Sequence, residues 1–155
     1  MTDARRPEIF SMTSDPEHLA LMRSWLREEL ARYDLSPQDQ SALLVAVGEL
    51  CTNSIRHAYE GVGGHPIRVS IQAFEDRLVI EVEDFGKPFD AGRYVEPDFD
   101  AAPEHGMGLY LVRKIADLVS LNVGQERGTH WTLVKYRPGR RPGPDASPGT
   151  ARGPV

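Results

Sequence analysis

Cysteine is nearly absent from this chain of 155 residues, because Cys51 is the single thiol. No intrachain disulfide can form, which excludes the disulfide-stapled scaffolds of many small secreted proteins. Long apolar runs are missing as well, whereas a helix that spans a membrane needs about 18–20 such residues. Arg5 and Arg6 lie near the start, but no apolar stretch follows them, so a twin-arginine export signal is not indicated. We therefore expect a cytoplasmic protein.

An excess of basic residues is also lacking. Asp and Glu total 23 against 18 Lys and Arg, which gives a formal net charge of -5. This balance disfavours nonspecific binding to nucleic acid or to anionic membranes, since both need basic surfaces. The 5 histidines show no metal-ligand spacing, so no zinc site is expected. The 40% of hydrophobic residues and 26% of charged residues are ordinary for one globular domain.

The spacing of apolar residues predicts where helices and strands lie. Strands are expected over 8–13, 67–73, 78–82, 119–123 and 129–136, and helices over 15–32, 37–59 and 106–119. Ser14 is expected to cap the first helix with Glu17 in the capping-box position, and Ser36 to begin the second helix. Residues 8–136 would form the domain, whereas 137–155, rich in Pro, Gly, Ser and Arg, are predicted to be a disordered tail.

The order of these elements decides the fold class. Strands and helices do not alternate, which excludes a doubly wound parallel sheet. The order predicts an α/β (α+β) sandwich, in which helices pack on one face of a mixed, mainly antiparallel sheet. Residues 84–105 break the periodicity and are rich in Gly, Pro and acidic residues. So long a stretch is typical of a functional or disordered loop, and we expect 87–105 to be a mobile lid.

The second predicted helix carries Glu49 and Asn53 four residues apart. That spacing places both side chains on one face of the helix, one turn from each other. Apolar residues flank them, and a carboxylate in partly buried surroundings is costly without a partner or a chemical role. One interpretation is a carboxylate beside a metal-binding amide. The other, which the pair alone favours, is a solvated stripe or a local hydrogen bond.

Asp84 and Gly86 follow a predicted strand. Alone, an Asp-x-Gly there is more typical of a turn. It also suits an aspartate that accepts a hydrogen bond from an exocyclic amine, with Gly86 letting the chain pass close to a base. Gly128-Thr129 begins the last strand, and alone it indicates only a hairpin turn.

Gly106 and Gly108 stand immediately before an amphipathic helix. Glycines at a helix N-terminus expose backbone N–H groups and admit a phosphate, which the helix dipole also favours. A lone Gly-x-Gly is weak evidence and is equally compatible with a purely structural role.

Taken together and in this order, the four segments resemble the N, G1, G2 and G3 boxes of the GHKL ATPase superfamily, the Bergerat fold. The resemblance covers about residues 8–136 and implies binding of ATP or ADP with Mg²⁺. It implies that Asn53 coordinates Mg²⁺, that Glu49 is the general base, and that Asp84 binds the adenine amine. The remaining nucleotide contacts that it implies come from Gly86, Gly106, Gly108, Leu109 and Thr129.

The branch of the superfamily follows from size and local sequence. Too few residues precede the second helix for the phosphoacceptor helix pair of a histidine kinase, and topoisomerases, Hsp90 and MutL are much longer. A stand-alone domain with these residues at 49–59 and 84–90 is similar to the anti-sigma-factor serine kinases. This resemblance implies a sigma factor and a STAS-domain antagonist as protein partners, phosphorylation of an antagonist serine, and a homodimer.

Two features depart from the family pattern. Pro88 replaces the second glycine of the longer Asp-x-Gly-x-Gly motif, and the loop that follows is short and acidic. Nucleotide binding is therefore better supported than catalysis. Three interpretations stay open at this point: a serine kinase that also sequesters a sigma factor, a nucleotide-dependent binding switch, and an α/β domain without a ligand.

Overall fold

The computed structural model describes residues 5–90, 107–124 and 127–140. Five strands form one sheet in the order β1-β2-β3-β5-β4, and every neighbouring pair is antiparallel. The strands are β1 (Glu8–Thr13), β2 (Pro66–Ala73), β3 (Arg77–Asp84), β4 (Leu118–Val123) and β5 (Thr129–Tyr136). The mainly antiparallel sheet is confirmed, and the parallel pairing that a mixed sheet would contain does not occur between these five strands.

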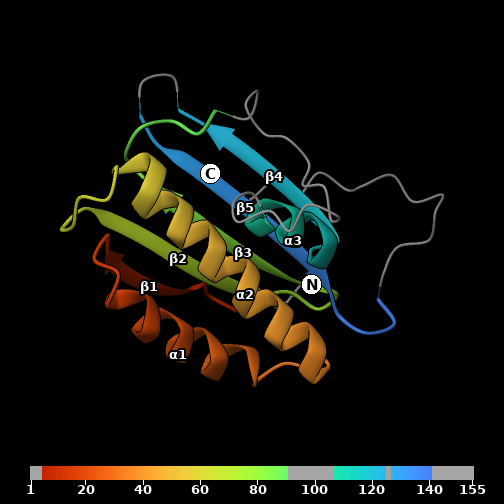
Figure 1. Ribbon diagram of the computed structural model, residues 1–155. Helices are drawn as coiled ribbons and strands as arrows, with labels where there is room; N and C mark the ends of the chain where they lie inside the picture. The colour runs from red at the N-terminus through yellow and green to blue at the C-terminus, as the bar shows by residue number, and fades with distance from the viewer. Residues whose placement is uncertain (1–4, 91–106, 125–126, 141–155) are drawn as a thin grey trace.

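The helices cover one face of the sheet, as predicted (Figure 1). They are α1 (His18–Leu30), α2 (Pro37–Asn53) and α3 (Met107–Ile115), and a π-helical turn, η1 (Ser54–Ala58), continues α2. Along β3, buried residues alternate with half-buried ones, which is the pattern of a strand with one face against a core. The core lies between the two layers and contains Leu43, Val47, Leu50, Ile67, Val69, Ile71, Leu78, Ile80, Val82 and Leu133.

The predicted start of α2 is confirmed, because the Ser36 side chain accepts a hydrogen bond from the Asp39 N–H at 3.1 Å and so caps the helix. The predicted cap of α1 is wrong. This helix begins at His18, and neither Ser14 nor Glu17 makes a side-chain capping bond to it. The third helix is shorter than predicted: it ends at Ile115, and Val119 belongs to β4.

The Ser14 hydroxyl serves a distant segment instead of α1. It donates to the carbonyl oxygen of Val62 at 2.6 Å and accepts from the His65 N–H at 3.0 Å. Ser14 is fully buried there, so the loop before β2 rests on it. Because the hydroxyl bonds the loop before β2, it is not available to cap α1.

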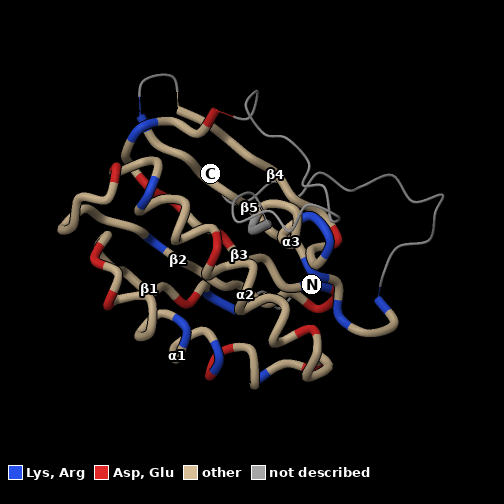
Figure 2. The backbone as a smooth tube through the Cα atoms, in the orientation of Figure 1, with Lys and Arg blue, Asp and Glu red and all other residues tan. Residues whose placement is uncertain are grey.

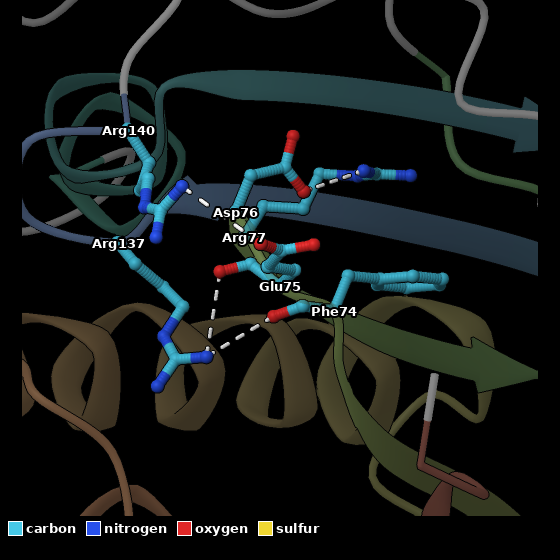
Figure 3. A network of polar contacts seen from close by, with 6 residues as sticks. All are labelled: Phe74, Glu75, Asp76, Arg77, Arg137 and Arg140. Atoms are coloured by element: carbon cyan, nitrogen blue, oxygen red, sulfur yellow. Dashed lines mark hydrogen bonds and ion pairs between the residues drawn. The ribbon is translucent and has the colours of Figure 1, made fainter. Parts of the chain in front are cut away.

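A network of polar contacts after the last strand ties residues 137–140 to the turn between β2 and β3 (Figure 3). Arg137 donates through Nη1 to the carbonyl oxygens of Phe74 at 3.3 Å and Glu75 at 3.5 Å, and its Nη2 lies 3.5 Å from the Asp34 carboxylate. The first residues of the predicted tail, 137–140, therefore pack against the turn between β2 and β3. The rest of that predicted tail lies outside the described residues.

Charged residues of both signs are spread over the part of the chain that the structure describes. Basic and acidic residues are interspersed along α1 and the sheet (Figure 2). In the part of the chain that the structure describes, no helix is long and apolar enough to cross a membrane.

Replacing Ser14 should destabilise the fold. Ser14→Ala leaves the Val62 carbonyl and the His65 N–H without their partner in a buried position, so we expect the free energy of unfolding to fall by about 1–3 kcal/mol. Urea denaturation measures this change. Ser11→Ala is the matched control, because Ser11 is exposed on β1, and it should change stability by less than about 0.5 kcal/mol. Equal stabilities for the two variants would contradict the role given to Ser14.

Candidate nucleotide-binding site

The helix α2 presents Glu49 and Asn53 on one face, as their spacing predicts. Both side chains are half-buried. Within the described residues, neither side chain makes a hydrogen bond or an ion pair. The structure therefore brings Glu49 and Asn53 together on α2 and gives neither side chain a partner among these residues.

Asp84 ends β3 and is 4% exposed. Its Oδ2 accepts a hydrogen bond from the Ser54 hydroxyl at 2.7 Å, and its Oδ1 accepts from the Gly86 N–H at 3.2 Å. Ser54 directly follows Asn53 in the sequence and opens the π-helical turn η1. The helix motif and the strand-end motif, 30 residues apart, are thus joined by one buried hydrogen bond.

Opposing effects act on the pKa of the Asp84 carboxyl group. Burial raises the pKa of Asp84 above its usual value, and the negative charge of Glu83 adds to this. The hydroxyl of Ser54 and the backbone N–H groups of Gly86 and Thr129 lower the pKa, because they donate to the ionised form. Burial is the largest of these effects, so the pKa of Asp84 is raised overall, and the donors oppose that rise.

Gly86 is needed for a reason that the sequence did not reveal. A Cβ at this position would lie 2.4 Å from the carbonyl oxygen of Ala58, closer than any side chain tolerates. The same carbonyl accepts the Lys87 N–H at 2.8 Å, and the Gly86 carbonyl accepts the Gly128 N–H at 2.8 Å. The sequence predicts a close approach of Gly86 to a base. The structure adds that it packs directly on the end of η1.

Tyr59 is a site residue that sequence reasoning missed. Its hydroxyl donates to the Pro66 carbonyl at 2.6 Å and accepts from the Phe85 N–H at 2.8 Å. It thereby fixes the backbone immediately after Asp84. No periodicity or motif points to such a role, since the tyrosine simply occupies the last position of a predicted helix.

Thr129 lies on β5 opposite Asp84 and is buried. Its Oγ1 accepts a hydrogen bond from the Phe89 N–H at 3.1 Å. The Phe89 ring meets the Trp131 ring edge-on, with 5.4 Å between the centroids. The segment after Asp84 is therefore anchored to β5, and the Gly128-Thr129 motif joins the helix and strand-end motifs.

The fourth motif is described only in part, because Gly106 and most of the predicted lid lie outside the described residues. Gly108 is in the first turn of α3, where backbone N–H groups have no partner within the helix. Leu109 is buried in the core, so only its backbone is available to a nucleotide. The helix α3 packs beside α2, the helix that carries Glu49 and Asn53.

A pocket of about 410 Å³ flanks this arrangement. It opens between the end of η1, the 59–65 loop and the backbone at 85–88, and it is lined by Ala58, Tyr59, Glu60, Val62, His65, Phe85, Gly86, Lys87, Pro88 and Arg127. Glu49, Asn53 and Asp84 are not among its walls. Among the residues that the structure describes, the pocket thus shares only Gly86 with the predicted nucleotide contacts.

Cys51 and His57, two other candidate residues, lie in surroundings that indicate no catalytic role. Cys51 is fully buried, and burial raises the pKa of its thiol to about 12, which suits a core residue and not a nucleophile. His57 is exposed at the end of the helix. No group of three or more potential metal ligands occurs within the described ranges.

Comparison with known proteins decides the family. The sequence profile described as "Histidine kinase-like ATPase domain" matches residues 12–135. The chain belongs to this family. Serine-protein kinase RsbW of Bacillus velezensis is 32% identical over 136 residues, which cover 83% of this chain and 84% of the relative. RsbW of Bacillus subtilis is 31% identical over the same length and shares.

Solved structures agree on the fold of this histidine kinase-like ATPase domain. The crystal structure of the RsbU and RsbW domains of a Mycobacterium tuberculosis protein matches it with a TM-score of 0.63 at 21% identity. The match covers 88% of this chain and 34% of that longer chain. The resemblance drawn from the four motifs is confirmed at the level of family and fold.

Gly86→Ala should disrupt the site. The added methyl group must displace the 84–87 backbone from the Ala58 carbonyl, so we expect stability to fall by about 1–3 kcal/mol and ADP affinity to fall at least about tenfold. Thermal unfolding and calorimetric titration measure the two effects. Lys87→Ala is the control, because the Lys87 side chain is 71% exposed and its 3.9 Å ion pair with Glu60 contributes little. Unchanged ADP affinity in Gly86→Ala would refute this role of Gly86.

Proposed function

We propose that this chain is an ATP-dependent protein serine kinase that also acts as an anti-sigma factor. The observation that carries the proposal is the bond between Ser54 and Asp84, because it unites the helix motif of Glu49 and Asn53 with the strand-end motif. Family membership and the similarity to serine-protein kinases RsbW support it. ATP or ADP would lie between α2, the segment after Asp84, and the start of α3.

Asp84 would recognise the base. An ionised carboxylate only accepts hydrogen bonds, so it pairs with the exocyclic amine of adenine. The buried surroundings strengthen such a bond, because water does not compete for it. Gly86 would lie against the ring, and Thr129 would add its hydroxyl nearby.

Asn53 fits a magnesium ion. Its side-chain oxygen is the kind of ligand that Mg²⁺ prefers, and this ion commonly uses one or two protein ligands together with substrate phosphates. The half-buried amide has no partner among the described residues, so it is available. A bound Mg²⁺ would neutralise phosphate charge during transfer.

Glu49 would act as the general base. It lies one turn before Asn53 on the same face of α2, where it can accept the proton of an attacking serine hydroxyl. A carboxylate next to an anionic triphosphate is unfavourable unless it has such a chemical role. The backbone N–H groups at the start of α3, including that of Gly108, would hold the phosphates.

The partners follow from the branch of the family. We propose a STAS-domain antagonist as the protein that is phosphorylated and a sigma factor as the protein that is sequestered. A homodimer is proposed on the same basis. The cytoplasm is the proposed compartment, since ATP is available there and the buried Cys51 is a free thiol.

Asp84→Asn should weaken ADP binding and remove one pH dependence. Loss of a charge-assisted bond costs about 1.5–3 kcal/mol, or roughly 10–100-fold in affinity. In the native protein the pKa of Asp84 is raised, so ADP affinity should decline as pH falls through a value above the usual range of an aspartate. Titrations of both proteins isolate this effect, because the nucleotide phosphates titrate equally in each. Parallel pH profiles would disprove the assignment of Asp84.

Glu49→Gln and Asn53→Ala should fail in different ways. Glu49→Gln should bind ADP normally but transfer phosphate about 10²–10⁴-fold more slowly, which is the usual contribution of a general base. Asn53→Ala should also lose the Mg²⁺-dependent part of nucleotide affinity. The assay follows labelled phosphate from ATP to candidate STAS-domain proteins.

Glu28→Gln serves as the control, because Glu28 is exposed on α1. If Glu49→Gln transfers phosphate at the native rate, Glu49 is not the base. If the native protein binds ATP but phosphorylates no STAS-domain protein, the nucleotide-dependent binding switch replaces the kinase.

A further inference from the structure

Ser54 belongs to none of the motifs described so far, yet its hydrogen bond to the Asp84 carboxylate is shorter than that of the Gly86 N–H. It is 4% exposed, and its hydroxyl donates to Oδ2 of Asp84 at 2.7 Å. It is the residue after Asn53, at the point where α2 becomes the π-helical turn and the Tyr59 N–H bonds the Ser54 carbonyl at 3.1 Å. Irregular helical turns of this kind often mark functional positions.

The two oxygens of Asp84 are held by different elements. Ser54 donates to Oδ2 from the helix, and the Gly86 N–H donates to Oδ1 from the loop at 3.2 Å. Each carboxylate oxygen can accept about two hydrogen bonds. Together with the backbone N–H of Thr129, these donors fix the orientation of the group. Among the described residues, at least one of its about four acceptor sites stays available to a donor supplied by a ligand.

Among the described residues, no cation lowers the pKa of Asp84, so only the hydrogen-bond donors oppose the effect of its burial. In the part of the chain that the structure describes, the titratable groups that interact with it electrostatically are Glu83 on its own strand, Tyr59 after η1, and Cys51 on α2. None of the three carries a positive charge. Of the groups that favour the ionised carboxylate, only Ser54 acts through its side chain.

We propose that Ser54 is a positioning residue that makes Asp84 selective for adenine over guanine nucleotides. The proposal rests on the proposed nucleotide site. Adenine presents a donor amine at the position where guanine presents a carbonyl oxygen. A carboxylate held in its ionised form accepts from the amine and repels the carbonyl. A protonated carboxyl group can donate to the carbonyl, so discrimination declines once the proton is retained.

Ser54→Ala tests this mechanism without changing any residue that touches the base. Calorimetry compares ADP, GDP and purine riboside 5′-diphosphate, which lacks the exocyclic amine. We expect ADP affinity to fall about fivefold to tenfold, consistent with the loss of one buried hydrogen bond. Affinity for the purine analogue should change less than about twofold, and the ratio of ADP to GDP affinity should fall.

The pH profile provides a readout that a merely structural role would not move. Loss of the Ser54 donor should shift the decline of ADP affinity to higher pH, by about half a unit or more for a fivefold effect. Ser70→Ala is the matched control, since Ser70 is also a buried serine but lies on β2, 3.4 Å from Glu81. It should leave all three affinities and the pH profile unchanged. Ser54→Cys keeps the shape with a weak donor and replaces Ser54→Ala if that variant does not fold.

The outcomes separate this inference from the proposed function. If the native chain binds none of the three nucleotides, the proposed function fails. If the native chain prefers ADP and Ser54→Ala keeps both the preference and the pH profile, only the role of Ser54 is overturned. An equal loss of ADP and of the purine analogue would also overturn it, because the effect would not pass through the amine.

Discussion

The carbonyl oxygen of Ala58 is the contact on which the rest of the site depends. It accepts the Lys87 N–H, and it leaves no room for a side chain at Gly86. This contact sets the distance between the end of the long helix and the end of β3. The bond from Ser54 to Asp84 and the two bonds of the Tyr59 hydroxyl then follow within the same short stretch. The end of β3 can serve as a binding position because the end of η1 packs directly against it.

Periodicity and local motifs predicted most of the layers correctly. The alternation in β2 and β3 predicted a half-buried antiparallel hairpin, and the Ser36 cap placed the start of α2. Both signals are local, since each depends on residues that are neighbours in the sequence. The spacing of Glu49 and Asn53 likewise fixed their common face, because helical geometry alone determines it.

What could not be predicted depends on contacts between distant segments. Ser14 has the sequence context of a helix cap, but its hydroxyl is used by Val62 and His65, which come about 50 residues later. Ser54 and Tyr59 look like ordinary helix positions until β3 is placed beside them. The four motifs predict residues that would touch a nucleotide but not those that hold these residues in position, because the latter have no fixed spacing relative to the motifs.

The edge-on contact between Phe89 and Trp131 makes Trp131 an intrinsic fluorescence probe of this part of the protein. The chain has 2 tryptophans. The other one, Trp25, packs against Phe10 of β1, which is the edge strand at the opposite end of the sheet from β4. Trp131 is 5% exposed and lies under the segment that Thr129 anchors. Indole emission responds to the polarity and to the rings around it, so any movement of that segment would alter the fluorescence of Trp131. A chain with Trp25 replaced by Phe would then report events at the strand end without an added dye.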